Sequence, residues 1–248
     1  MKTIFNIILI LLLYFDVTAQ YQDSNIKYIW KNEKSNITAA IDIYGLQQNK
    51  NSFCIFYINS VDTVYNNISD SLFNEFANIS SLNCPVVKIS FYNIPDTNST
   101  VKMKLYAEEL SNFIISDVLK KLPAVKSNNF IVSGLDFYAA VVLYAATTHA
   151  TKINKTALFL SETDDAGLLK NIAFADLKKL KGKMYFYVNH QHAEKLFADA
   201  IATNIALSSN VVLYKFDNFG AFQSAFIFEE AFNWLLADGN NYIIRDTH

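Results

Sequence analysis

Short apolar runs rich in β-branched and aromatic residues alternate along this chain with longer segments of helical spacing. The predicted strands lie at 28–30, 37–46, 53–58, 86–92, 129–133, 155–160, 184–188 and 210–216. The predicted helices lie at 71–77, 105–122, 137–149, 174–180, 191–208 and 222–237. Strands that alternate with helices form crossover connections, so we expect an α/β fold: a mainly parallel sheet with helices on both faces.

The early strand at 37–46 makes the predicted sheet mixed. Its residues alternate between apolar and small or polar side chains, which is typical of a half-exposed antiparallel strand, whereas the later runs have the pattern of strands buried on both faces. We find no internal repeat and no linker of low complexity. The sequence predicts one three-layer domain.

The first nineteen residues have the parts of an export signal. Lys2 supplies a positive charge, residues 4–14 are almost entirely apolar, and Ala19 ends a short-residue stretch suited to signal peptidase. We therefore predict a signal peptide at 1–19, a single domain at 20–248, and a secreted or periplasmic protein without a membrane span after cleavage. The apolar run is shorter than the roughly 20 residues that a spanning helix needs.

Net charge limits the classes of partner. The formal charge is −2, and the hydrophobic fraction is 52%. Such a chain has no basic surface for nucleic acid and enough apolar side chains for a substantial core. The partners left open are a small molecule, a glycan or an extracellular protein, and no cofactor is predicted.

Two cysteines remain in the mature chain, Cys54 and Cys84, each at the start of an apolar run. If those runs are neighbouring parallel strands, the two thiols lie within reach of a disulfide in an oxidising compartment. The alternative is a pair of buried free thiols. Neither cysteine is predicted to be a nucleophile, because apolar surroundings raise the pKa of a thiol.

Ligands of a parallel sheet usually bind beyond the carboxyl ends of its strands. The residues there that we consider candidates are Asn59, Ser60, Phe137, Ser161, His190 and His192. The two histidines form a His-x-His pair, but two ligands do not make a metal site, and no metal is predicted. The acidic stretch at 161–165 is interpreted as a solvated loop.

The segment NFIVSGLDFYAAVVLYAATTHA, residues 129–150, runs from a buried strand directly into an apolar helix. It resembles the strand–turn–helix in which α/β-hydrolases carry their nucleophile, G-x-S-x-G. The run LYAA at 143–146 and the strand KTALFLS at 155–161 resemble secreted esterases of the esterase-D and enterochelin-esterase type. This resemblance implies an α/β-hydrolase-like three-layer sandwich and an ester-hydrolysing ancestry.

The catalytic positions that the resemblance implies are changed in this chain. Gly134 matches the first glycine of the motif, but Asp136 stands at the nucleophile position and the bulky Tyr138 stands where a small residue is expected. The position of the catalytic histidine falls near Ala221, and no histidine occurs between Asp217 and Trp234. A nucleophile without its base loses most of its reactivity.

Three interpretations follow from these residues. The first is an esterase-like protein that has lost its activity and serves as a binding or interaction module, with Asp136 capping the helix that follows. The second is an active ester hydrolase that uses Asp136 with a base from His190 or His192. The third is a carbohydrate-binding or cell-surface-binding protein with exposed aromatic side chains around the strand ends.

Overall fold

The structure is a computed structural model. It describes residues 26–45, 53–60, 84–92, 100–125, 129–135, 137–149, 152–160, 182–189, 211–216, 225–236 and 244–246. The predicted signal peptide at 1–19 and the predicted helices at 71–77, 174–180 and 191–208 lie outside these residues.

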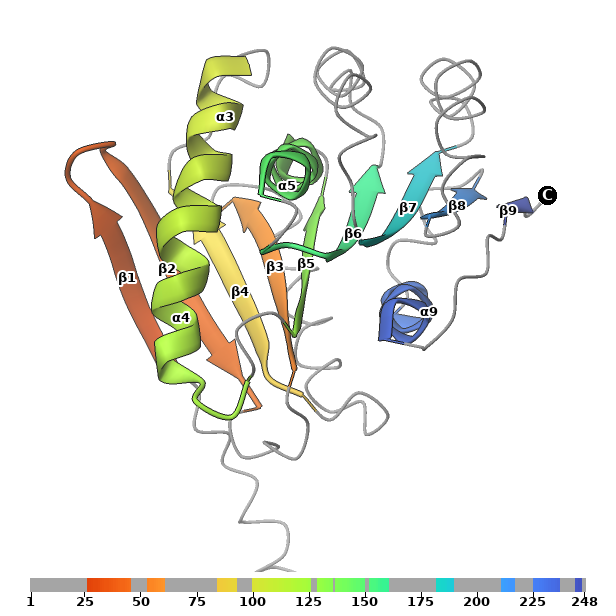
Figure 1. Ribbon diagram of the computed structural model, residues 1–248, viewed down its shortest axis with the longest axis horizontal. Coiled ribbons are helices and arrows are strands. Elements are labelled where there is room, and N and C mark those ends of the chain that lie inside the picture. The colour runs from red at the N-terminus through yellow and green to blue at the C-terminus, as the bar shows by residue number, and fades with distance from the viewer. Residues whose placement is uncertain are drawn as a thin grey trace, which may run out of the picture.

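The described strands form one sheet (Figure 1). Their bounds are β1 Ile26–Asn32, β2 Ile37–Tyr44, β3 Cys54–Ser60, β4 Val86–Phe91, β5 Phe130–Leu135, β6 Lys155–Leu160, β7 Lys183–Asn189, β8 Val211–Phe216 and β9 Ile244–Asp246. The order across the sheet is β1-β2-β4-β3-β5-β6-β7-β8-β9.

Strand β2 gives the sheet its mixed character. It pairs antiparallel with both β1 and β4, whereas each pairing from β4 through to β9 is parallel. The mixed, mainly parallel sheet predicted from the alternation of residues 37–46 is thereby confirmed. Parallel neighbours need crossover connections, and α5 and α9 supply two of them.

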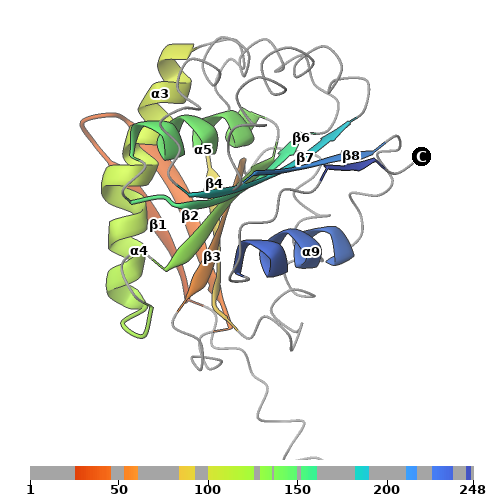
Figure 2. The same ribbon diagram turned by 45° about the vertical axis from the view of Figure 1, so that its right-hand side comes forward.

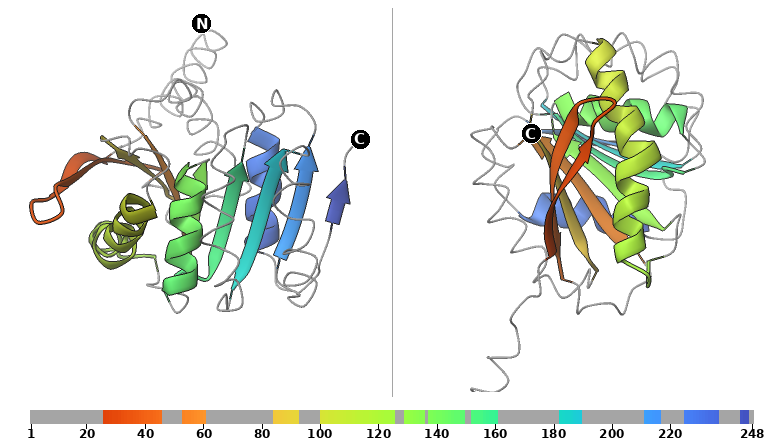
Figure 3. Two further views of the ribbon diagram at one scale, coloured as in Figure 1. Left: turned by 90° about the horizontal axis from the view of Figure 1, so that it is seen from above. Right: turned by 90° about the vertical axis from the view of Figure 1, so that its left-hand side faces the viewer.

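Helices cover both faces of the sheet (Figures 2 and 3). One face carries α3 (Thr100–Glu109), the π-helical turn η2 (Leu110–Ile114), α4 (Ile115–Lys121) and α5 (Phe137–Thr148), and α9 (Ala225–Leu236) lies on the other face. Side chains alternate along a strand, so each strand feeds two cores. In β3, for example, Phe56 belongs to the core beneath α3 and α5, whereas Tyr57 belongs to the core beneath α9.

Two features differ from the sequence-based prediction. The predicted helix at 105–122 begins earlier, at Thr100, and contains a π-turn at Leu110–Ile114. Strand β9, only three residues long, was not predicted because a run that short has no periodicity to detect. No described helix is both long and apolar enough to span a membrane.

Candidate functional site

The turn from β5 to α5 brings helix and strand into very close contact. A Cβ atom placed on Gly134 would lie 2.5 Å from the carbonyl oxygen of Tyr138 and 2.9 Å from the amide nitrogen of Ala139. Those are backbone atoms of the first turn of α5, so they cannot rotate out of the way. Glycine is therefore required at this position, as in the first glycine of a nucleophile elbow. Asp136 itself lies outside the described residues.

Four aromatic rings fill the space beside this turn. The Tyr138 ring stacks on Phe91, at the end of β4, with ring centroids 5.7 Å apart and an interplanar angle of 10°. Tyr106 of α3 meets Phe91 edge-on at 4.7 Å, and Phe137 meets Tyr138 edge-on at 5.3 Å. Each of the four side chains is at most 5% exposed. This corner of the described structure is packed with rings, in the edge-on and stacked geometries that aromatic pairs favour.

A buried polar pair lies at the same end of the sheet, on its other face. The Ser90 hydroxyl donates to Asn59 Oδ1 over 2.6 Å, and the two residues are direct partners in the parallel register of β3 and β4. Burial of these groups is tolerated because they are hydrogen-bonded. Nearby, the Ser133 hydroxyl donates to the carbonyl oxygen of Phe56 over 3.2 Å.

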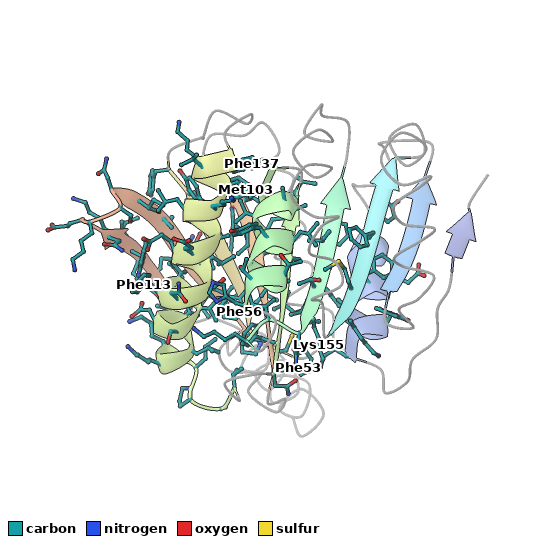
Figure 4. All side chains as sticks on the ribbon, turned by 45° about the horizontal axis from the view of Figure 1, so that its top comes forward. Phe53, Phe56, Met103, Phe113, Phe137 and Lys155 are labelled. Carbon is teal, nitrogen blue, oxygen red and sulfur yellow. The ribbon has the colours of Figure 1, made fainter. Side chains whose placement is uncertain are left out.

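Two of the predicted site residues lie at the same end of the sheet, but on its opposite faces. Asn59 and Phe137 both lie at the carboxyl ends of the strands, as expected, and Figure 4 shows Phe137 at the opposite end of the sheet from Phe53 and Lys155. Ser60 pairs with Phe91 through its backbone. The remaining predicted residues, Ser161, His190, His192 and the position near Ala221, lie outside the described residues.

Sequence reasoning missed Ser90, Phe91 and Tyr106. The sequence contains each of them in a predicted strand or helix, where core packing is the ordinary interpretation. Ser90 contacts Asn59 only because β3 and β4 are neighbours, and Tyr106 contacts Phe91 only because α3 crosses the end of β4. Among the described residues, no group of three or more His, Cys, Asp and Glu side chains is placed to hold a metal ion.

The two cysteines lie at the amino ends of β3 and β4, and these strands are parallel neighbours, which is the condition set for the reach of a disulfide. Both are buried free thiols in the structure. Cys54 belongs to the core beneath α3 and α5, and Cys84 to the core beneath α9. Burial raises the pKa of Cys84 to about 12. Burial, and secondarily the nearby Cys84, also raises the pKa of Cys54. The sequence left a disulfide and two buried free thiols open as alternatives, and the structure has the free thiols.

Solved structures with the same architecture identify the fold. A ferulic acid esterase superposes with a TM-score of 0.60 at 10% identity, covering 86% of this chain and 98% of that one. An S-formylglutathione hydrolase from Agrobacterium tumefaciens gives 0.61 at 10% identity, with 88% and 97% covered. The chain has the α/β-hydrolase fold. A siderophore hydrolase from Aspergillus nidulans, with a TM-score of 0.55 at 11% identity and 89% and 98% covered, agrees.

In this α/β-hydrolase fold, the β5–α5 turn stands where the nucleophile elbow stands. No protein-family model and no curated protein sequence matches the chain. Identities of 10% and 11% show the shared fold and leave the activity to be decided by the residues of the site.

Proposed function

We propose that this protein is a secreted, esterase-like α/β-hydrolase-fold protein that has lost catalytic activity and serves as a binding or interaction module. The observation that carries the proposal is the environment of Tyr138. Its ring stacks on Phe91 and contacts Phe137 and Tyr106, so the start of α5 is held by aromatic packing. A large buried side chain replaces the small residue that the elbow motif has two positions after its nucleophile.

The sequence supports the same conclusion on chemical grounds. The residue between Leu135 and Phe137 is Asp136, and the stretch between Asp217 and Trp234 contains no histidine. A carboxylate needs no base to attack an alkyl carbon, where it displaces the leaving group and forms an ester with the enzyme, but hydrolysis of that ester needs a water activated by a positioned base. Without that histidine, a covalent intermediate would accumulate and turnover would stop.

Hydrolysis of p-nitrophenyl acetate and butyrate by the purified mature protein tests the proposal. We expect no release of p-nitrophenol above the rate with heat-denatured protein. Turnover by the wild-type protein that disappears in Asp136→Ala would overturn the proposal. Asn112→Ala, which changes an exposed side chain on the π-turn, serves as the control for unspecific loss.

An active hydrolase that uses Asp136 with His190 or His192 is the second candidate. The observation that favours it is the close approach at Gly134, because the first glycine that a nucleophile elbow needs is retained. This candidate predicts that Asp136→Ala and one of His190→Ala and His192→Ala both abolish turnover of the same ester. A wild-type protein without turnover eliminates it.

A further inference from the structure

Strand β1 forms one edge of the sheet. It is seven residues long and pairs with β2 on one side, and no described strand pairs with it on the other. The right-hand view of Figure 3 looks onto this edge, with β1 in front of the other strands. An edge strand of this length offers a row of backbone N–H and C=O groups to any chain that can lie beside it in extended form.

The register of the sheet shows which residues of β1 direct their backbone groups outward. The backbone N–H of Tyr92 donates to the carbonyl oxygen of Thr38 over 3.1 Å, so Thr38 directs its backbone groups away from β1. Lys31 is the partner of Thr38 in β1, and these two residues therefore form a pair without hydrogen bonds. Because such pairs alternate along an antiparallel ladder, Ile29 and Lys27 also direct their N–H and C=O groups to the open edge.

The same three residues present exposed side chains on one face of the sheet. Ile29 is 56% exposed and lies between Lys27 and Lys31, which are both exposed. The ammonium of Lys27 lies 3.9 Å from Asp42, yet the Lys27 side chain is 64% exposed. Residues 26–36 contain three lysines and one glutamate, although the whole chain has a formal charge of −2. Lys27, Ile29 and Lys31, which we call the β1 edge, are therefore a locally basic margin of the sheet.

We propose that the β1 edge binds an extended acidic segment of a partner protein, which adds a strand to the sheet. Hydrogen bonds to the backbone of Lys27, Ile29 and Lys31 supply the affinity, and the side chains opposite them supply the specificity. Side chains alternate along a strand, so the segment carries two acidic residues four positions apart, opposite the lysines, and an apolar residue midway, opposite Ile29. This inference rests on the proposed binding role and names the class of the partner.

The two lysines also decide which strands are rejected. Lysine on an edge strand discourages pairing with most other strands, including the same strand of a second copy. If Ile29 lies beside Ile29 of a second copy, an antiparallel arrangement sets Lys27 opposite Lys31, and a parallel one sets each lysine opposite its counterpart. Both arrangements place like charges side by side, which is unfavourable, whereas a carboxylate in the same place is attractive. The charges therefore favour an acidic partner over self-association.

Fluorescence anisotropy with two labelled peptides tests this proposal. The first is a nine-residue peptide of threonines with glutamate as its third and seventh residues and valine between them as its fifth, and the second has lysine in place of both glutamates. We expect the wild-type protein to bind the glutamate peptide at least about tenfold more tightly than the lysine peptide. The double variant Lys27→Glu/Lys31→Glu should reverse this preference. Lys102→Glu/Lys120→Glu, which makes the same change of net charge at exposed lysines of α3 and α4, is the matched control and should keep it.

Ile29→Pro tests the backbone hydrogen bonds separately from the charges. Proline lacks an N–H, and the N–H of Ile29 points to the open edge, so the pairing of β1 with β2 is retained. We expect Ile29→Pro to weaken binding of the glutamate peptide at least about tenfold, and Ile29→Thr, which keeps the N–H, to weaken it less. Circular dichroism verifies that each variant is folded.

Three results would overturn the proposal: no binding of either peptide by the wild-type protein, equal binding of both, or a preference that Lys27→Glu/Lys31→Glu leaves unchanged. Sedimentation that shows a wild-type dimer, dissociated by Ile29→Pro, would assign the β1 edge to a second copy of the chain and also overturn it. Ester hydrolysis measured on the same samples separates this proposal from the loss of activity, because either can fail alone.

Discussion

At position 134 the strand and the following helix approach so closely that only a hydrogen atom fits as a side chain. The obstructing atoms belong to the backbone of Tyr138 and Ala139, so relief requires α5 to move away from the sheet. That movement would also pull Tyr138 from its stacked position on Phe91. One residue thus sets both the elbow geometry and the aromatic packing beside it.

Gly134→Ala is expected to destabilise the protein by about 3 kcal/mol or more, as overpacking against immovable neighbours does. Urea denaturation followed by circular dichroism measures the change. Ser133→Ala, one residue earlier in the same strand, is the control. It removes one hydrogen bond to Phe56 and is expected to cost about 1 kcal/mol. Equal effects of the two changes would contradict the close approach described at Gly134.

The cysteines lead to a prediction about pH. Because burial raises the pKa of Cys84 from 9.0 to about 12, the folded protein holds this thiol protonated where the unfolded chain ionises it. The contribution of Cys84 to stability is therefore complete below about pH 9 and is lost as the pH rises toward 12. In Cys84→Ala, the free energy of unfolding should therefore fall less steeply above about pH 9 than in the wild-type protein. Urea midpoints measured between pH 7 and about pH 10.5 test it.

The same thiols should be inert in the native state. At pH 8 we expect Ellman's reagent to label neither cysteine until denaturant is added, after which two thiols react, because both are free and buried. Denatured, unreduced protein with no reactive thiol would instead show that Cys54 and Cys84 form the disulfide. Rapid labelling before denaturation would contradict their burial.

At the scale of elements, the feature that needs explanation is the π-turn η2 in the continuous helix formed by α3, η2 and α4, which we call the long helix. Side chains eight residues apart in a regular α-helix are about 80° apart around the axis, yet Glu109 and Asp117 both reach β1. A π-turn closes with an i→i+5 bond and so absorbs one extra residue. The turn at Leu110–Ile114 thereby returns both carboxylates to the side facing Asn32 and Tyr28.

Deleting a single residue tests this account. Removal of the exposed Asn112 should convert the π-turn into a regular turn, keep the hydrogen bonds from Tyr28 to Asp117 and from Asn32 to Glu109, and lower stability by no more than about 1 kcal/mol. Removal of Glu108, equally exposed but outside the turn, should cost more than about 3 kcal/mol, because the buried Met103, Tyr106 and Ala107 shift by one position. Urea denaturation of both variants gives the comparison. Similar losses would contradict the compensating role of the turn.

The sequence predicted the regular elements well where the hydrophobic pattern was strong. Strand β6 has the predicted bounds, and β5, β7 and α5 differ from theirs by one or two residues. The π-turn was not predicted, because the residues within it are ordinary helix residues and the reason for it lies across space in Tyr28 and Asn32. A local pattern cannot report a register that a neighbouring strand imposes.

At the scale of the whole molecule, the two cores share one sheet. Adjacent residues of a strand belong to different cores, as Ile131 and Val132 of β5 do. Loss of packing on one face therefore loosens the strands that support the other face. The two cores are expected to unfold together, in one cooperative transition.

Leu110→Ala and Leu235→Ala test this cooperativity from opposite faces. Both side chains are completely buried. Leu110 belongs to the core beneath α3 and α5, and Leu235 belongs to the core beneath α9. Each change is expected to cost about 2–5 kcal/mol and to lower the same single melting transition. Calorimetry should show one peak in both variants. Two peaks, of which each variant shifts only one, would contradict the shared sheet.

Taken by itself, the sequence determined the layered α/β architecture, the antiparallel character of β2 and the importance of the segment around Gly134, because these depend on local periodicity and turn chemistry. The order of the strands, the Asn59–Ser90 pair and the stacking of Tyr138 on Phe91 were decided only by the tertiary structure. Each of these joins residues distant in the chain, and which distant elements become neighbours is settled by the packing of the whole sheet and its helices.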